Sequence, residues 1–530
     1  MKFKYLYLII ATFIIVYASS CKKELTSVNT NPDAIPAAQY NPNLLLTTVQ
    51  LMYTGSTDFG GSAWATKWGA VACFIQHTAS TNAGFYYGDK YANNIGAMGE
   101  MFQDSYISEV QPVVELYLLT ANKPQYRNLH QMARIMKAMV FEQITDLYGD
   151  IPYFQAGLGY YDRIYTPAYD KQQIIYTDML KEVSQAVDSL DQSADAPSGD
   201  VLYSNLGKNA QIAEWKEFGN SLLVRMAMRL SKVDPATAQS YVTKAAANTF
   251  KSNADNAIVQ HQDGNQLTQN RDALEIFGND STDLRLSWAF INNMKINNDP
   301  RLPVVAWIYS QDSNGNSTGD ITPANQVGMP PGYIVGGNNP LYDITKITNP
   351  DSLPKILTGI AGYSRLNDNI LNTAAPSLIL TYAETEFLLA DAAKRWGIAG
   401  NAATHYKNGV LAAVTQLAAY GGAATISDAD AATYYNNVAY NDALGLDQIN
   451  TQYWLCTLMD EYEAWSNWRR TGSPNLTPVN YPGNVTSGTI PRRLTYPPSQ
   501  KITNLANYNA EVGTLTGGDK MTTRVWWDSK

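Results

Sequence analysis

Residues 129–152, LHQMARIMKAMVFEQITDLYGDIP, carry the clearest pattern of secondary structure in the chain. Their apolar side chains recur mainly at intervals of three and four residues, which places them along one face of an α-helix. This face consists of Leu129, Met132, Ile135, Met136, Met139, Val140, Ile144 and Leu147. Gly149 is expected to end the helix, because glycine adopts the backbone conformations of a helix terminus easily and Pro152 prevents continuation. The pattern predicts a long helix with one buried face.

The same helical periodicity recurs along the chain. Residues 215–230 form a second apolar stripe, and Asp234 followed by Pro235 is a good cap and first-turn pair for the next helix. Further helices are expected near residues 99–121, 170–191, 282–297, 376–396, 401–420 and 444–470. Paired helices of this length resemble tetratricopeptide units, although the letters show no strict repeat. The sequence therefore predicts a mainly α fold, a scaffold of tetratricopeptide-like helix pairs.

Two regions depart from the helical pattern. Residues 298–375 are rich in Gly, Pro and Asn and contain the short β-type runs LPVVAWIY and PGYIVGG, and residues 471–520 are loop-rich. Irregular segments on a rigid scaffold are where binding residues concentrate. We expect a single domain over residues 21–530, in which long irregular loops and a few short strands, mainly those of residues 298–375, carry the ligand site.

The amino terminus has the layout of an export signal. Two lysines precede an apolar run from Leu6 to Ala18, which is shorter than the ~20 residues that span a bilayer as a helix. The residues ASSC that end at Cys21 resemble a bacterial lipobox, in which the cysteine becomes the lipidated first residue. An ordinary signal peptide cut nearby, with an incidental cysteine, is the alternative. We expect residues 1–20 to be a signal peptide and the membrane attachment to be a lipid on Cys21 only.

Composition excludes several classes of partner and site. The chain of 530 residues has 38 Lys and Arg against 47 Asp and Glu, a net charge of −9, so nucleic acid is not an expected partner. No Cys/His ligand set for zinc occurs, and Cys73 and Cys456 are expected to be unpaired thiols rather than a disulfide. Residues 312–320, DSNGNSTGD, imitate a calcium loop without its glycine and final glutamate, so a hairpin tip is favoured over a calcium site. We expect no metal and no cofactor.

The sequence contains no common catalytic motif. The histidines are dispersed, and no nucleophile elbow, phosphate loop or dinucleotide fingerprint occurs. Carboxylate pairs such as Glu384 with Glu386 lie on one predicted helix, whereas a glycosidase needs two carboxyl groups across a cleft. One acid from each of two loops stays an open possibility. A helical polysaccharide hydrolase or lyase is therefore the enzyme alternative to a binding protein, and a scaffold for protein partners is a third reading.

Several segments, in their order along the chain, resemble one known family. They follow the lipobox and are DLYGDIPYFQAG (146–157), EWKEFGNSLLVRMAMRLSKVDP (214–235), NNDPRLPVVA (297–306), EAWSNWRRTGSPNL (463–476) and IPRRLTYPPSQ (490–500). Together they resemble SusD/RagB-type nutrient-binding lipoproteins, and the similarity spans nearly the whole mature chain. The resemblance implies tetratricopeptide-like helix pairs with an irregular ligand-binding portion.

The resemblance also implies a function. Such proteins are not enzymes: they sit as a hinged lid over a SusC-like TonB-dependent outer-membrane transporter and bind an oligosaccharide or other nutrient for import. Lys22, Lys23 and Glu24 are similar to the short signal that sends some lipoproteins to the outer cell surface. We therefore expect an outer-membrane, lipid-anchored protein that faces the cell exterior. Arg469 and Arg470 are expected to form ion pairs within the scaffold rather than to contact ligand.

Glycan sites in this family use aromatic and amide side chains that follow the first helices and lie in the central irregular portion. Here both segments are rich in Gly and Asn, so we expect their aromatic residues not to be fixed by helical packing. A ring face covers the apolar face of a sugar, and an amide bonds its hydroxyl groups. The predicted platform consists of Trp64, Trp68, Tyr86, Tyr87, Trp307, Tyr309, Tyr333 and Tyr342, with the amide of Asn338.

Overall fold

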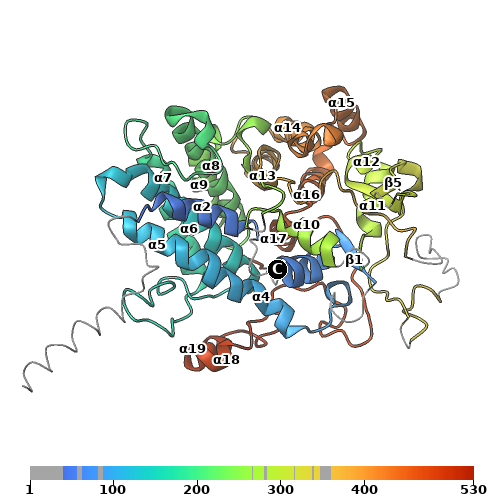
Figure 1. The fold of residues 1–530 in the computed structure, drawn as a ribbon, viewed down its shortest axis with the longest axis horizontal. Coiled ribbons are helices and arrows are strands. Elements are labelled where there is room, and N and C mark those ends of the chain that lie inside the picture. Colours follow the sequence, from blue (N-terminus) through green and yellow to red (C-terminus); the bar gives the residue numbers. More distant parts are fainter. Residues whose placement is uncertain are drawn as a thin grey trace, which may run out of the picture. The chain divides into compact units, whose positions relative to one another are not determined.

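Helices make up most of the structure, so the expected mainly α fold is confirmed (Figure 1). The computed structural model describes residues 40–55, 62–81, 87–265, 267–279, 283–314, 317–336, 339–346 and 360–529. Residues Asn43–Lys530 form one compact unit. The signal segment and Cys21 lie outside the described residues. Within the described ranges, no helix is both long enough and apolar enough to cross a membrane.

The first half of the chain forms helices that pack on one another in sequence order. They are α2 (Asn43–Tyr53), the π-helical η1 (Ser62–Val71), α3 (Ala72–Phe74), the short 3-10 helix η2 (Gly88–Lys90), α4 (Ile95–Ser105), the π-helical η3 (Tyr106–Val110), α5 (Gln111–Thr120), α6 (Arg127–Tyr148), α7 (Gln172–Ser189), α8 (Lys208–Arg229) and α9 (Pro235–Ala245). Helix α5 packs on α6, α6 on α7, α7 on α8 and α8 on α9. Consecutive helices are therefore neighbours, whereas the tetratricopeptide-like geometry of the pairs stays a prediction.

The second half adds another group of helices, which lies beside the first through α13 and α8. Its members are α10 (Arg271–Ala273), the π-helical η8 (Leu274–Asn279), α11 (Trp288–Ile296), α12 (Leu302–Val305), α13 (Tyr382–Trp396), α14 (Ala402–Thr415), α15 (Asp428–Asn437), α16 (Gly445–Cys456) and α17 (Glu461–Thr471). The short helices α18 (Gln500–Thr503) and α19 (Leu505–Val512) lie apart from this group (Figure 1). Helix α13 packs against both α14 and α16, which Figure 1 shows grouped together.

Short antiparallel strands hold the irregular segments to the helices. Strand β1 (Thr78–Ser80) pairs with β3 (Leu284–Leu286), β2 (Ala257–Val259) pairs with β7 (Ser377–Leu380), and β4 (Ala306–Gln311) lies between β5 (Ser317–Asp320) and β6 (Arg365–Leu366). Strands β4 and β5 pair as an antiparallel hairpin, which agrees with the hairpin predicted for this calcium-like segment, and residues 315 and 316 lie outside the described residues. The hairpin brings part of the 298–375 region into a small sheet.

The long helix predicted from residues 129–152 is confirmed as α6. All eight residues of its apolar stripe are buried in the core. The helix ends at Tyr148, because Gly149 takes a φ of +83° and donates its N–H to the Thr145 carbonyl at 2.8 Å. At the start of α9, the Asp234 side chain accepts the N–H of Thr237 at 3.1 Å, which confirms the predicted cap.

Some predicted helix boundaries are wrong. The helix expected over 376–396 begins only at Tyr382, because the preceding residues pair with β2 as strand β7 and Thr381 caps the helix. The helix expected over 282–297 likewise begins at Trp288, after β3. The helix expected over 444–470 is two helices, α16 and α17. The chain turns at Met459, which has a φ of +85°, and Asp460 then caps the amino terminus of α17.

A buried network of charged side chains joins the two groups of helices. Arg225 on α8 donates to Glu142 on α6 at 2.8 Å, and Arg229 pairs with Asp146 at 2.9 Å and with Glu463 on α17. Arg470 on α17 pairs with Asp391 on α13 at 2.9 Å, which confirms its predicted role within the scaffold. Removal of one partner from such a pair strongly destabilises the fold, because the other charge is left unpaired in the interior. The network therefore fixes the relative orientation of these helices.

Candidate functional site

Four partly exposed tyrosines from three loops lie near one another: Tyr87, Tyr333, Tyr342 and Tyr481, here called the tyrosine cluster. The rings of Tyr342 and Tyr481 have centroids 5.1 Å apart and an interplanar angle of 72°. The pKa of Tyr481 is raised first by burial and then by the nearby charges of Asp89, Tyr87 and Tyr342. Burial also raises the pKa of Tyr333, with a smaller contribution from Tyr342. The ring contact joins Tyr342 to Tyr481, and the charge contributions indicate that Tyr87 lies near Tyr481 and Tyr333 near Tyr342.

A buried carboxylate joins the first two of these loops. Asp89 accepts the backbone N–H of Gly332 at 2.9 Å and the N–H of Ser80 at 3.3 Å. Its other oxygen accepts from Lys90 Nζ at 2.6 Å, and Lys90 also donates to the Ser80 carbonyl at 2.6 Å. The Asp89 and Lys90 side chains have no exposed surface. The positions of Tyr87 and Tyr333, which adjoin these residues, are therefore set by an internal ion pair.

The third loop packs directly on the second. Gly332 has a φ of +88°, and a Cβ atom at this position would lie 2.3 Å from a methyl group of Val479. Only glycine allows this approach without displacement of one loop. Tyr342 adds a hydrogen bond of 3.3 Å from its hydroxyl group to the Asn480 carbonyl. Tyr481 therefore follows two residues that contact the second loop.

The structure thus brings together Tyr87, Tyr333 and Tyr342 of the predicted platform. Tyr86 and Asn338 lie outside the described residues. Tyr481 was not among the predicted residues, although it lies in the loop-rich segment 471–520 and is followed by Pro482 and Gly483. This signal, an aromatic residue in a turn, is the same one that identified the other tyrosines.

Trp307 and Tyr309 form a separate aromatic pair on β4. Their ring centroids are 5.6 Å apart, and the Arg365 guanidinium lies 4.4 Å from the centroid of the Tyr309 ring. Trp307 is 7% exposed and packs on Gly319 of the neighbouring strand, where an added Cβ atom would lie 2.7 Å from the Trp307 ring. Tyr309 is partly exposed. Of this pair, only Tyr309 presents appreciable ring surface to solvent.

The expectation that Trp64 and Trp68 lie free of helical packing is wrong, because both are in the π-helical η1. Trp68 has no exposed surface, and its indole N–H donates to Asp272 at 2.8 Å. Trp64 is partly buried and packs against the main core. The ring of Trp68 therefore contributes to the core rather than to an exposed platform.

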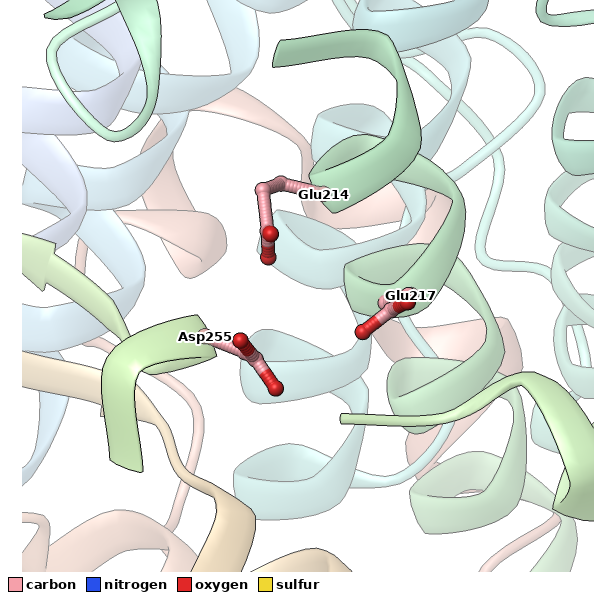
Figure 2. Close-up of side chains that lie close together, drawn as sticks. All are labelled: Glu214, Glu217 and Asp255. Carbon is pink, nitrogen blue, oxygen red and sulfur yellow. The ribbon is translucent and has the colours of Figure 1, made fainter. Parts of the chain in front are cut away.

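An acidic group on α8 and the turn after α9 is a possible cation site (Figure 2). Oxygen atoms of Glu214, Glu217 and Asp255 all lie within 4.8 Å of one another, and Figure 2 shows the three carboxylates converging. However, Lys251 pairs with Glu217, and Asp255 accepts the backbone N–H groups of Lys251 and Ser252 at 2.7 and 2.8 Å. Burial and the two neighbouring carboxylates raise the pKa of Glu214 to about 7. Glu217 and Asp255 are therefore engaged in local structure, whereas the buried Oε2 atom of Glu214 has no hydrogen-bond partner among the described residues.

The two described cysteines are unpaired, and two carboxylates of the calcium-like segment bond to nearby backbone N–H groups. Cys73 and Cys456 are both free thiols, as predicted, and burial raises the pKa of Cys73 to about 12. In the hairpin, Asp312 accepts the N–H of Asn314 at 2.8 Å, and Asp320 accepts the N–H of Thr322 at 2.7 Å. These carboxylates stabilise their own turns.

Comparisons with known proteins agree on one relationship. A family model described as "Starch-binding associating with outer membrane" (SusD-like) matches residues 38–497. A chitin-binding protein of known structure is 31% identical, with a TM-score of 0.78 over 92% of this chain and 100% of that chain. The Bacteroidetes AC2a SusD-like structure is 26% identical, with a TM-score of 0.79, and the match covers 93% of this chain and 100% of that chain. A chitin-binding SusD homolog from Flavobacterium johnsoniae, which is 22% identical, has the same fold. Its TM-score is 0.71, and the match covers 92% of this chain and 99% of that chain. No curated protein matches the sequence.

Proposed function

The chain belongs to the SusD-like family of starch-binding proteins that associate with the outer membrane, and from this premise we propose that its tyrosine cluster binds an oligosaccharide for import. The observation that carries the proposal is the convergence of Tyr87, Tyr333, Tyr342 and Tyr481 from three loops. Tyrosine suits this role, because its ring covers the C–H face of a sugar while its hydroxyl group bonds the sugar edge.

The energetics favour a shallow site of moderate affinity. Covering on the order of 100 Å² of apolar surface with one ring stabilises a complex by roughly 2.5 kcal/mol, at ~25 cal/mol per Å². Immobilising the ligand offsets part of this gain, so several rings together give micromolar to millimolar affinity. Tyr86 and Asn338 are proposed to complete the platform, and Tyr309 with Arg365 to extend it. Trp68 is left out because it is fully buried.

The site has the features of a binding surface rather than of a hydrolase. A glycosidase needs two carboxyl groups that face the scissile bond from opposite sides. In the described loops around the cluster, Asp89 pairs with Lys90 at 2.6 Å and Asp343 with Lys346 at 2.9 Å. Both acids thus stabilise the loops. These pairings support a ligand-binding role over the hydrolase or lyase alternative.

Calorimetry tests this proposal. Chitin oligosaccharides are the first ligands to examine, because the 31% identical relative is a chitin-binding protein, and malto-oligosaccharides are the second. In the variants Tyr342→Ala and Tyr481→Ala we expect the affinity to fall at least about tenfold, since each removes one stacking face. Tyr160→Ala is the matched control, because Tyr160 is 89% exposed but lies outside the cluster. Binding that survives both cluster substitutions would place the site elsewhere.

Attachment to the outer membrane is proposed to occur through a lipid on Cys21, with the body at the cell exterior. Each buried methylene of an acyl chain contributes ~0.8 kcal/mol, so several chains hold a protein firmly where one does not. We expect Cys21→Ala to release the protein from membranes. Retention of this variant on membranes that contain no transporter partner would contradict the lipid anchor, and protease treatment of intact cells would test the exterior location.

The partner is proposed to be a SusC-like TonB-dependent transporter, over which this protein forms a lid. A stable contact of this kind needs an interface of at least about 1,000 Å², which the rigid helical scaffold is large enough to supply. We expect the two proteins to co-purify in mild detergent from the native host. Recovery of the lipoprotein without any outer-membrane barrel would count against the lid.

A further inference from the structure

Two glutamates from different helices meet at one tyrosine hydroxyl group in the interior. Glu384 lies on α13, Tyr453 on α16 and Glu463 on α17. The Tyr453 hydroxyl oxygen is 3.0 Å from Glu384 Oε1 and 2.5 Å from Glu463 Oε1. Tyr453 has no exposed surface, and Glu384 and Glu463 are 3% and 6% exposed. The three polar groups therefore depend on one another for hydrogen bonds.

This tyrosine has one hydrogen for two carboxyl groups. Burial raises the pKa of Tyr453 well above its usual value, and Glu384 and Glu463 raise it further, so the hydroxyl group keeps its hydrogen. A hydroxyl group donates one hydrogen bond and otherwise accepts. It satisfies one ionised carboxylate, whereas the second contact needs a hydrogen from the carboxyl group itself. Two buried carboxylates this close avoid mutual repulsion when one of them retains a proton.

The surroundings of Glu463 identify it as the ionised partner. The 2.5 Å contact with Tyr453 is typical of a hydroxyl group that donates to a carboxylate, and Arg229 pairs with the other oxygen of Glu463. Burial opposes ionisation of Glu463, but the charges of Arg229 and Arg225 outweigh it and lower the pKa of this carboxyl group. Tyr453 therefore donates its hydrogen to Glu463.

The arginine beside Glu384 is engaged by another acid. Arg225 gives hydrogen bonds of 2.8 and 3.1 Å to Glu142 on α6, while its Nη1 atom is 3.5 Å from Glu384 Oε1. Burial raises the pKa of Glu384 to about 8, and the charges of Glu463 and Asp460 add to this effect, whereas that of Arg225 opposes it. The 3.0 Å contact with the tyrosine oxygen thus suits a protonated Glu384 that acts as the donor.

The ionisable groups that interact with Glu384 come from the helices around α13. They are Arg225 on α8, Tyr453 and Cys456 on α16, and Asp460 and Glu463 at the start of α17. Charged groups on the other elements packed against α13 have different partners. His405 on α14 pairs with Glu386 at 2.9 Å, and Lys244 on α9 pairs with Asp188 at 2.7 Å. Asp255 on the short helix η7 (Asn253–Asp255) accepts backbone N–H groups.

We propose that Glu384 is protonated in the folded chain at neutral pH and donates its hydrogen to Tyr453, which in turn donates to Glu463. One bound proton thus joins α13, α16 and α17 through two consecutive hydrogen bonds. When this proton is lost at alkaline pH, two negative charges face a single hydroxyl group and the junction of the three helices weakens. This pH-sensitive junction belongs to the scaffold and does not depend on the proposed sugar site.

The raised pKa of Glu384 determines the direction of the pH dependence. The usual pKa of a glutamate is 4.5, so Glu384 binds its proton more tightly in the folded chain than in the unfolded chain. The stability that this proton contributes is therefore complete below about pH 4.5 and is lost progressively as the pH rises to about 8.

Infrared spectroscopy detects the proton directly. In the mature chain labelled with ¹³C at the glutamate carboxyl groups, we expect the C=O band of protonated carboxyl groups to lose intensity at pH 7 in Glu384→Gln. Glu182→Gln is the matched control and should leave the band unchanged, because Arg134 bonds Glu182 at 2.8 Å and lowers its pKa against the effect of burial. Equal band intensity in Glu384→Gln and the unsubstituted chain would overturn the proposal.

Stability measurements distinguish the two glutamates. Glutamine at position 384 resembles a protonated glutamate and supplies an N–H donor for Tyr453, so Glu384→Gln should change the denaturation midpoint little at pH 6. Glu463→Gln removes an anion that pairs with Arg229 and should lower the midpoint clearly more. Between pH 6 and about 9, the unsubstituted chain should lose stability relative to Glu384→Gln. Equal losses in the two variants at pH 6, or a difference between Glu384→Gln and the unsubstituted chain that stays constant with pH, would contradict the bound proton.

A third variant tests the bond if Glu384→Gln does not fold. Tyr453→Phe removes the hydroxyl group that accepts the hydrogen of Glu384, so the C=O band of the protonated carboxyl groups should shift in frequency. An infrared spectrum of Tyr453→Phe identical to that of the unsubstituted chain in this region would show that Glu384 does not donate to Tyr453.

Discussion

The Asp89 carboxylate accepts the backbone N–H of Gly332 at 2.9 Å, although 243 positions separate the two residues in the sequence. This contact joins the loop of Tyr87 to the loop of Tyr333. Because Lys90 neutralises Asp89 in the interior, the geometry of the proposed sugar platform depends on a buried ion pair.

Asp89→Ala should therefore lower both stability and glycan affinity. Lys90 would be left as an unpaired buried charge, a change that costs about 3 to 5 kcal/mol. Chemical denaturation measures this loss. Asp188→Ala is the control, since the pair of Asp188 with Lys244 is exposed and contributes at most about 1 kcal/mol. A loss in Asp89→Ala no larger than that of the control would contradict the structural role of the pair.

Gly332→Ala should disturb the same contact from the opposite side. The new Cβ atom would meet Val479 at 2.3 Å, and the φ of +88° is itself unfavourable for alanine. We expect a loss of about 2 to 5 kcal/mol, from ~1 to 2 of backbone strain and ~1 to 3 of overpacking, together with weaker glycan binding. Gly397→Ala, with a φ of +67° and open space around it, carries only the backbone strain. Equal effects of the two substitutions would show that Val479 moves aside freely.

Much of the scaffold follows from local sequence. The stripe of α6, its end at Gly149 and the Asp234 cap of α9 depend on neighbouring residues, and all were predictable. The start of α13 was not, because the apolar run Ser377–Leu380 fits a helix as well as a strand. Its pairing with β2 selects the strand, and β2 lies more than a hundred residues earlier in the chain.

The candidate site was only partly predictable for a related reason. Gly- and Asn-rich context identified the segments of Tyr87, Tyr333 and Tyr342 correctly as loops. Tyr481 lies beside them because its loop is held by Tyr91, whose carbonyl accepts the N–H of Val485 at 2.9 Å. No local sequence pattern predicts this contact. A hydrogen bond from the Trp68 indole to Asp272, 204 positions away, helps to hold Trp68 in the core. Long-range contacts thus decided which aromatic rings remain exposed.

Trp68 and Tyr342 should respond to substitution in opposite ways. Trp68→Ala removes a fully buried ring and is expected to cost about 3 to 5 kcal/mol of stability, while the folded fraction keeps its glycan affinity. Tyr342→Ala should weaken glycan binding and change the melting temperature little. Thermal denaturation and calorimetry on both variants measure the two effects. If Trp68→Ala lost glycan affinity but not thermal stability, Trp68 would contact the ligand and the core role would be contradicted.

The carboxyl group of Glu109 should make the stability of the fold depend on pH. Its pKa is about 7 in the folded chain, raised from 4.5 chiefly by burial. The Ser105 hydroxyl bond lowers this pKa and the charge of nearby Asp104 raises it slightly. A carboxyl group with a raised pKa binds its proton more tightly in the folded state than in the unfolded state. Ionisation of Glu109 therefore destabilises the fold progressively as the pH rises from about 4.5 to about 7.

Above pH ~7 the full penalty applies, which is about 3 kcal/mol for a shift of this size at ~1.4 kcal/mol per unit. Glu109→Gln cannot ionise, so its stability relative to the unsubstituted chain should increase between pH 5 and 8, roughly by this amount. Denaturant titrations of both proteins across that range measure the difference. Asp162→Asn, at an exposed position, controls for the loss of one negative charge. A difference that stays constant with pH, or that favours the unsubstituted chain at pH 8, would mean that Glu109 is stabilised as an anion by a donor within the protein.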